Sequence, residues 1–355
     1  MHKVKYGIIG TGMIAGIHAE AIRQLENAEL YMVYDKDPSR ARAFAQKYHC
    51  QFSPDFETFL KSDIEAVTIA TPSGFHAEAA IPAACAGKHI LCEKPIETTV
   101  EKAEALINRC AENNVLLSTV FQSRFAKNVT LIKKAIDDGR FGKPVLASAS
   151  IRWFRTPEYY TNAGWRGTWL LDGGGALMNQ GIHTADLLLY FNGDVESVHA
   201  YANRALHQSI EVEDTIVASI KFKNDSLGVL EASTACAPGF PRRVELSGTQ
   251  GSVVLEGDRI VRWQFTDENP KDEEIRRICG QGEGLQGGFA SPDGISCEGH
   301  RRQLQELTDA ILRGQALSVP GTEGKRVIEL ICAIYESAEA GYPVKISTGI
   351  APCGN

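Results

Sequence analysis

Apolar residues recur at two different spacings in the first third of the chain. Short apolar runs predict buried strands at 4–9, 29–34, 66–70, 89–92 and 115–120. An apolar residue at every third or fourth position predicts helices at 14–25, 38–48, 75–86 and 100–113. Strands that alternate with helices in this way indicate a doubly wound parallel sheet with helices on both faces.

The pattern changes after residue 122. Helical spacing predicts helices near 126–137 and at 176–191, and a long strand is predicted between them at 144–154. From 195 to 263 the sequence is a series of strands joined by short turns, which indicates an antiparallel sheet. Two further helices are expected at 299–312 and 323–340, whereas 267–297, rich in glycine and charge, is predicted to be a loop.

Two domains follow from this change of pattern, in a mixed α/β chain. Residues 1–122 are expected to form the parallel, doubly wound domain, and residues 123–355 an α+β domain with a large, open, mostly antiparallel sheet. The C-terminal helices are expected to pack back on the first domain. Helices should cover only one face of the second sheet, so its other face is expected to form a homodimer or homotetramer.

Composition narrows the class of protein. Hydrophobic residues make up 43% of the 355 residues and charged residues 23%, as in a water-soluble globular protein. A formal charge of −7 argues against a nucleic-acid or anionic-membrane partner, and there is no apolar run of about 18 residues that would span a bilayer. The N-terminus resembles a first strand more than a signal peptide. Nine cysteines without a C-x-x-C pair favour reduced thiols in the cytoplasm over a disulfide framework or a zinc site.

A glycine-rich stretch, GIIGTGMIAGIH, links the first predicted strand to the first helix. Gly10, Gly12 and Ala15 have the spacing G-x-G-x-x-A. In a dinucleotide-binding Rossmann domain the first glycine permits a tight turn, the second admits a pyrophosphate, and the third small residue lets the helix approach the strand. The phosphates would lie at the helix N-terminus, beside Met13 and Ile14.

An acidic residue at the end of the second strand supports this interpretation. Asp35 stands 25 residues after Gly10, where a carboxylate accepts hydrogen bonds from the adenosine ribose and repels a 2′-phosphate. The cofactor is therefore predicted to be NAD, with NADP as the alternative, because Lys36 and Arg40 stand nearby and weaken the repulsion. The competing interpretation is a structural turn with Asp35 as a helix cap.

Two further motifs are more specific than the glycine loop. The fourth main strand ends in CEKP, Cys92 to Pro95, and GGGALMNQGIH runs from Gly173 to His183. Together with GTGMIA and the residues Thr71, Pro72 and His76, they resemble the glucose–fructose oxidoreductase, inositol dehydrogenase and rhizopine-catabolism family (Gfo/Idh/MocA) along the whole chain.

That resemblance implies an NAD(P)-dependent enzyme that transfers a hydride between nicotinamide and a secondary hydroxyl or ketone of a sugar, sugar derivative or polyol. It places Lys94 between nicotinamide and substrate and His183 near the reacting hydroxyl. It implies a cofactor cleft lined by Thr71, Pro72 and His76, and we expect Glu93 and Gln122, at the ends of neighbouring strands, to contact the cofactor as well. It also implies that a cis peptide bond precedes Pro95, and that the C-terminal sheet builds the oligomer interface.

One departure from the family pattern concerns the residue four positions before His183. Many inositol-dehydrogenase-like members carry aspartate there, but this chain has Asn179. On a helix the two residues share a face and both reach the substrate. An amide binds a hydroxyl but is not a base, which argues against an Asp–His proton relay and against myo-inositol.

Chemistry assigns roles to the two catalytic candidates. Removal of a hydride from a carbinol requires a base for the hydroxyl proton and a cation for the developing alkoxide. We expect His183 to be the base and Lys94 the cation, although the two roles are exchangeable. The structural alternatives are a surface lysine and a packed histidine. Asp186 is expected to be structural, as a partner for the histidine or for neighbouring backbone.

Substrate contacts are less sharply defined. Trp165 and Arg166, and the loop from Arg155 to Tyr160, offer aromatic rings for sugar faces and guanidinium groups for carboxylates or phosphates. Further candidates for the same crevice are Gln122, Arg124, Asn179 and His300.

Two other functions remain open from the sequence. A glycoside-cleaving enzyme would oxidise the sugar transiently on a retained NAD and would release no net NADH. A non-catalytic NAD(H) sensor would depend on Gly12 but not on Lys94. Metal chemistry is not expected, because no cluster of metal-ligating residues has a convincing spacing.

Overall fold

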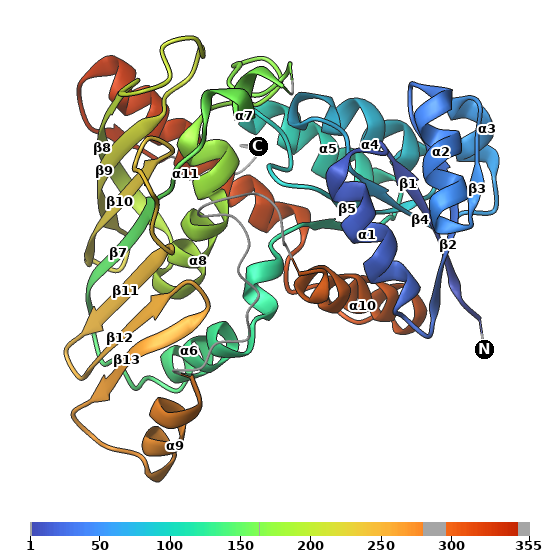
Figure 1. Ribbon diagram of the computed structural model, residues 1–355. Helices are drawn as coiled ribbons and strands as arrows, with labels where there is room; N and C mark the ends of the chain where they lie inside the picture. The colour runs from blue at the N-terminus through green and yellow to red at the C-terminus, as the bar shows by residue number, and fades with distance from the viewer. Residues whose placement is uncertain (1, 163, 280–295, 347–355) are drawn as a thin grey trace, which may run out of the picture.

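The computed structural model describes residues 2–162, 164–279 and 296–346. They form two sheets that stand side by side with helices between and around them (Figure 1). A six-stranded sheet occupies the N-terminal part of the chain, and an eight-stranded sheet occupies the remainder. Within the described residues, no helix is long and apolar enough to cross a membrane.

The six-stranded sheet is wholly parallel, in the order β3-β2-β1-β4-β5-β6. This is the strand order of a dinucleotide-binding Rossmann fold, as the alternating pattern predicts. Its elements are β1 (Val4–Ile9), α1 (Met13–Arg23), β2 (Ala28–Tyr34), α2 (Pro38–Tyr48), β3 (Gln51–Phe52), α3 (Phe56–Lys61), β4 (Ala66–Ile69), η1 (Ser73–Phe75), α4 (His76–Cys85), β5 (His89–Cys92), α5 (Val100–Glu112) and β6 (Leu117–Thr119).

The strand order reverses between β1 and β4, and this opens a crevice at their carboxyl ends. Gly10 follows β1 there with φ +89°, and a Cβ at this position would lie 2.8 Å from the carbonyl oxygen of Ala70. Only glycine suits both the backbone conformation and the close approach. The first glycine of the loop therefore lets the chain turn tightly against the neighbouring strand.

The eight-stranded sheet is mixed, with antiparallel pairs throughout except for parallel β7 and β10. Its strand order is β13-β12-β11-β7-β10-β9-β8-β14. The strands are β7 (Pro144–Arg152), β8 (Val195–Asn203), β9 (Thr215–Phe222), β10 (Leu227–Ser233), β11 (Arg243–Gly248), β12 (Gly251–Glu256), β13 (Arg259–Phe265) and β14 (Val344–Lys345). The remaining helical segments are η2 (Gln122–Phe125), α6 (Lys127–Asp137), α7 (Pro157–Thr161), η3 (Ala176–Gly181), α8 (Ile182–Asn192), α9 (Pro270–Cys279), α10 (Glu298–Arg313) and α11 (Gly321–Ala340).

Helices cover one face of this sheet. In Figure 1 α6, α8 and α11 all lie on the side that faces the first sheet. Burial alternates along β9 and β10, so that every second residue packs into the core and the others point away from the helices. The outward residues include Leu146, Tyr201, Val217, Leu227 and Val229, all of them exposed. The sheet thus has a large outer face that is partly apolar.

The last two long helices return to the first sheet. Helix α10 packs against α1, β1 and β5, and α11 lies between β8 and α5. Gln303 on α10 donates its side-chain amide to the carbonyl oxygen of Thr119 at 2.6 Å, at the end of β6. The C-terminal part of the chain therefore closes one side of the crevice made by the N-terminal part.

Two predicted elements differ in the structure. Residues 267–297 are predicted to be a loop, but Pro270–Cys279 form helix α9, which packs on β13. The carboxylate of Asp272 is its anchor, since it accepts hydrogen bonds from Trp263 and from Arg140. Partners outside the helix do not affect the spacing of apolar residues along it, so the spacing could not predict this helix. The rest of the predicted loop, 280–295, lies outside the described residues.

Arg124 is a second correction, because it does not face the crevice. Its side chain is 4% exposed and donates from Nε to both carboxylate oxygens of Asp186 at 3.0 Å. Its Nη2 also donates to Glu323 at 2.8 Å. Arg124, predicted to contact substrate, is thus engaged with two carboxylates and does not line the cavity described below, and Asp186 pairs with Arg124 and not with His183. The guanidinium instead joins η2 to α8 and α11.

Replacement of Arg124 by methionine is expected to destabilise the protein. The fully buried carboxylate of Asp186 would lose its cation, which costs about 3–5 kcal/mol. The urea midpoint should fall accordingly, while R109M, which removes an exposed arginine of α5, should shift it far less. An R124M variant of unchanged stability but weakened ligand binding would contradict the structural role.

Candidate active site

A cavity of about 690 Å³ lies where the two halves of the chain meet. Its lining includes every site residue predicted from the sequence except Arg124. Of the predicted cofactor contacts these are Gly10, Gly12, Met13, Ile14, Asp35, Lys36, Arg40, Thr71, Pro72, His76, Glu93 and Gln122, and of the predicted catalytic and substrate contacts they are Lys94, Trp165, Arg166, Asn179, His183 and His300.

The glycine loop has room for a dinucleotide. No atom would lie within 4 Å of a Cβ at Gly12, which borders the cavity at the start of α1. Asp35 accepts hydrogen bonds from Thr11, from the main-chain nitrogen at 2.8 Å and from the hydroxyl at 2.7 Å. The acid therefore fixes the loop and also lines the cavity. These residues fit a pyrophosphate at the α1 N-terminus and a ribose at Asp35.

The two cations near Asp35 have different surroundings. The Nζ of Lys36 lies 2.8 Å from the carboxylate of Glu78, whereas the guanidinium of Arg40 lies 4.0 Å from Asp35. Both side chains are exposed at the rim of the cavity. Lys36 is thus engaged with an acid of its own, and Arg40 is the cation adjacent to the predicted ribose position.

Lys94 reaches across the cavity from the end of β5. It precedes Pro95 through a cis peptide bond, and its ammonium donates to the main-chain oxygen of Asn179 at 2.9 Å. An ammonium has three donors, and no other acceptor among the described residues is within hydrogen-bond reach. Burial lowers the pKa of Lys94, and the charge of Arg166 lowers it further. Lys94 therefore holds free donors in a site that disfavours its charged form.

His183 approaches from the other half of the molecule, on the first turn of α8. Its Nδ1 is buried without a hydrogen-bond partner in the described residues. Burial holds the pKa of His183 well below its ordinary value, and the charges of Lys94 and Arg242 act in the same direction. The imidazole is therefore neutral at neutral pH and able to accept a proton.

The segment before His183 is a π-helix, η3, and not the continuous α-helix that the spacing predicts. The carboxylate of Glu213 accepts the main-chain N–H groups of Gly175 and Leu177, both at 2.9 Å, and so fixes the start of η3. A Cβ at Gly175 would lie 1.7 Å from the carbonyl oxygen of Glu213, so glycine is required there. Single π-turns of this kind are frequent at functional sites.

Asn179 meets a carboxylate that sequence reasoning missed. Its side-chain amide donates to Asp172, whose other oxygen accepts the main-chain N–H of Gly167 at 2.9 Å. Burial raises the pKa of Asp172 to about 6. Asp172 thus connects the loop that carries Arg166 to the residue whose carbonyl holds Lys94. Seven residues separate Asp172 from Asn179 across three glycines, so no periodic signal links them.

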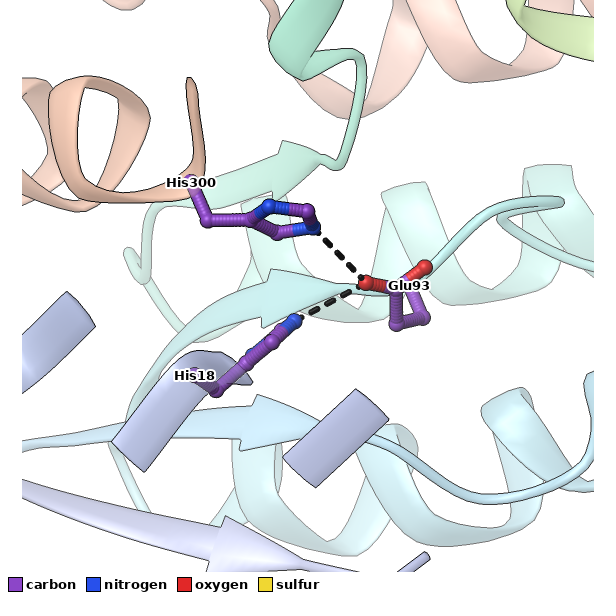
Figure 2. Close-up of side chains that lie close together, drawn as sticks. All are labelled: His18, Glu93 and His300. Atoms are coloured by element: carbon purple, nitrogen blue, oxygen red, sulfur yellow. Dashed lines mark hydrogen bonds and ion pairs between the residues drawn. The ribbon is translucent and has the colours of Figure 1, made fainter. Parts of the chain in front are cut away.

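A second missed feature is a buried cluster of His18, Glu93 and His300 (Figure 2). They come from α1, the end of β5 and α10, and both imidazoles point their Nε2 at one oxygen of Glu93, at 2.9 and 3.6 Å. The other oxygen of Glu93 accepts the main-chain N–H of Lys94 at 3.1 Å.

The donor set is of a kind that binds metals, but its geometry favours hydrogen bonds between the imidazoles and the carboxylate. The Nε2 of His18 contacts the carboxylate at hydrogen-bond distance, and the Nδ1 atoms of both histidines have no partner among the described residues, whereas metal-bound histidines usually have one. Burial alone would raise the pKa of Glu93, but hydrogen bonds from His18 and His300 hold it well below its ordinary value. The cluster therefore holds an ionised carboxylate behind Lys94.

Several lining residues were not named as individual sites. Arg155 donates to the side-chain oxygen of Gln180 at 2.8 Å, and Gln180 donates to the hydroxyl of Tyr159 at 2.6 Å. Arg242 lines the cavity from the turn before β11 and donates to the hydroxyl of Ser123 at 3.0 Å. Arg155 and Tyr159 belong to a loop whose composition predicts ligand contacts, whereas nothing local distinguishes Arg242.

The fold and the cavity together define a dinucleotide-binding protein with a lysine and a neutral histidine facing one ligand space. Family models agree: residues 4–121 match the oxidoreductase family with an NAD-binding Rossmann fold, and residues 129–254 match the GFO/IDH/MocA C-terminal domain. The chain belongs to this family of NAD-binding oxidoreductases, as its motifs suggest.

Relatives of known structure or activity extend over the whole chain. The WlbA dehydrogenase from Bordetella pertussis, solved with NADH and UDP-GlcNAcA, is 31% identical with a TM-score of 0.90, and 98% of each chain is covered. The myo-inositol 2-dehydrogenase of Thermotoga maritima is 26% identical, with 97% of this chain and 98% of the relative covered. A levoglucosan dehydrogenase of Pseudarthrobacter phenanthrenivorans is 27% identical over 95% and 97%.

The pair of Asp172 and Asn179 is expected to tolerate exchange but not the loss of either partner. D172N leaves one acceptor oxygen for two donors, and N179D places two carboxylates in contact, so each should lower kcat/KM by about 10–100-fold through misplacement of Lys94. The double variant D172N/N179D restores one amide and one carboxylate and should recover most of the activity. Additive losses in the double variant would contradict this coupling. NADH affinity serves as the control for folding.

Proposed function

We propose that the protein is an NAD-dependent dehydrogenase that transfers a hydride between nicotinamide and a secondary hydroxyl or ketone of a sugar, sugar derivative or polyol. The observation that carries the proposal is the convergence of Lys94 and His183, from opposite halves of the chain, on the cavity that contains the glycine loop. A hydroxyl group placed between them would meet a base and a cation at once.

His183 is the proposed proton acceptor in the direction of oxidation. Its imidazole is neutral because burial and neighbouring cations lower its pKa. Bound NAD supplies the hydride acceptor, and the protein supplies alignment. As the substrate oxygen gains negative charge, the free N–H donors of Lys94 stabilise it in a site of low dielectric. Glu93 and Asn179 fix the two ends of the lysine through its main-chain nitrogen and its ammonium.

The relatives support a carbohydrate substrate. Among them are a myo-inositol 2-dehydrogenase, a levoglucosan dehydrogenase and a dehydrogenase solved with UDP-GlcNAcA. The cavity volume of about 690 Å³ leaves space for a small ligand beside a dinucleotide. Asp35 at the ribose position supports NAD over NADP, since its carboxylate would repel a 2′-phosphate.

A substrate panel tests the proposal directly. Sugars, inositols, sugar acids and nucleotide sugars are supplied with NAD and with NADP, and absorbance at 340 nm reports reduced cofactor. Stoichiometric NADH with one class of compound, and a preference for NAD, are the expected results. Cleavage of a glycoside without net NADH would instead identify a glycoside-cleaving enzyme, and binding of NADH without any turnover would favour a sensor.

Loss of either catalytic candidate should affect the chemical step more than cofactor binding. K94M and H183N are each expected to lower kcat by about 10²–10⁴-fold, because each removes a group that acts on the substrate oxygen. The dissociation constant for NADH, measured by fluorescence, should stay within a few-fold. A variant with unchanged kcat would exclude that residue from catalysis.

Assembly through the outer face of the eight-stranded sheet is also part of the proposal. Tyr201 lies opposite Val217 in the β8–β9 ladder, and Leu227 opposite Leu146 in the β7–β10 ladder, on the face without helices. An apolar surface of this kind suits a homodimer or homotetramer. Seven cysteines, at 50, 85, 92, 110, 236, 297 and 332, are free thiols, which suits a reducing compartment, so we place the protein in the cytoplasm.

A charge on the outer face should disrupt the assembly. V217E places a carboxylate among apolar neighbours, and the expected result is a monomer by size exclusion with light scattering. The matched control is V261E, which alters an exposed valine of β13, near the sheet edge. A wild-type protein that is already monomeric would refute the assembly.

A further inference from the structure

We infer that Arg166, together with Arg155, forms a binding site for an anionic group of the substrate, a carboxylate or a phosphate. This inference rests on the proposed dehydrogenase function and defines its substrate class as acidic sugars. It concerns a different place from the glycine loop, because both arginines lie on the segment between β7 and η3, beyond Lys94.

Arg166 is held in place but not neutralised. Its guanidinium lies 4.1 Å from the centre of the Tyr159 ring, and Nη1 donates to the main-chain oxygen of Tyr159 at 3.2 Å. Its Nε is buried without a hydrogen-bond partner, and no carboxylate of the described residues lies within ion-pair distance of this side chain. A buried donor without an acceptor is costly unless a ligand completes it.

Arg155 brings a second positive charge to the same ring. It lies 5.4 Å from the centre of Tyr159, its Nη2 contacts Gln180, and burial lowers its pKa with a further contribution from Arg166. Two guanidinium groups around one tyrosine repel each other. A ligand that bears negative charge would relieve that repulsion, and the planar donors of arginine suit bidentate contacts with carboxylate or phosphate.

Other charged residues of the cavity also favour an anionic ligand. Lys94 and Arg242 also line the cavity, and neither forms an ion pair with a carboxylate of the described residues. The nearby acids accept their hydrogen bonds from other groups, Glu93 from two imidazoles and Asp172 from Gly167 and Asn179, and Asp172 acts on Lys94 and Arg166 only through its charge. Asp258 lines the cavity too and acts on Arg242 through its charge. A neutral sugar would bring no negative charge to Arg166, which forms no ion pair within the described residues and whose Nε has no acceptor there.

Binding is tested with compounds that differ only in charge. The NADH-loaded protein is titrated calorimetrically with matched neutral and anionic partners of several configurations, such as glucose, glucuronate and glucose 1-phosphate, or galactose and galacturonate. We expect the tightest ligand to be anionic. Preference for the uronate identifies a carboxylate as the natural group, and preference for the sugar phosphate identifies a phosphate.

The R166Q variant assigns that preference to the arginine. It should weaken the anionic ligand by about 10–100-fold, the effect of one charge-assisted contact, and leave the neutral partner within about threefold. R166K, which keeps the charge but not the planar fork, should recover part of the affinity. R152Q, which removes an exposed arginine of β7, should change neither, and NADH affinity reports that each variant is folded.

Three outcomes would overturn the inference: a neutral sugar as the tightest ligand, equal weakening of both partners by R166Q, or no binding by any anionic compound. Because the titration needs no turnover, its failure differs from failure of the proposed function. Anions that bind through Arg166 without producing NADH would refute the dehydrogenase and leave the anion site. Oxidation of a neutral sugar by the wild-type protein, with no binding or oxidation of its anionic counterparts, would do the reverse.

Discussion

One hydrogen bond crosses the cavity, between the ammonium of Lys94 and the main-chain oxygen of Asn179. It joins the end of β5 to the π-helix of the second half, so the two sheets must be placed correctly before it forms. Burial lowers the pKa of Lys94 and so disfavours its charged form. The position and charge of the lysine therefore depend on the groups that contact it. Glu93 holds its main chain, and Asp172 holds the residue that receives its side chain.

The surroundings of Lys94 are assembled from distant parts of the chain. Glu93 is kept ionised by His18 and His300, which arrive from α1 and α10 (Figure 2). Helix α1 begins at the glycine loop, and α10 is part of the C-terminal return. The cluster thus links the predicted pyrophosphate site to the lysine through one buried carboxylate. A shift of α10 would therefore move groups at both the predicted pyrophosphate site and Lys94, because closely packed helices transmit displacements to their neighbours.

The sequence predicted those features that depend on local spacing. Gly10 and Asp35 mark the strand-to-helix turn and the end of the next strand, and a Rossmann domain needs both at fixed offsets. Lys94 and His183 were found through motifs. Arg124 was misplaced because its partners, Asp186 and Glu323, lie 62 and 199 residues away, and only tertiary packing reveals such pairing. Asp172 and the His18–Glu93–His300 cluster were missed for the same reason.

Asn179 shows how one substitution changes the interpretation of a whole site. In place of an acid beside His183, the chain carries an amide that donates to Asp172, so the negative charge lies one step further from the reacting position. Burial lowers the pKa of His183, and the charges of Lys94 and Arg242 lower it further. An imidazole with such a low pKa binds a proton only weakly. The driving force for proton removal must come from cations that stabilise the substrate oxygen, which is the task the geometry gives to Lys94.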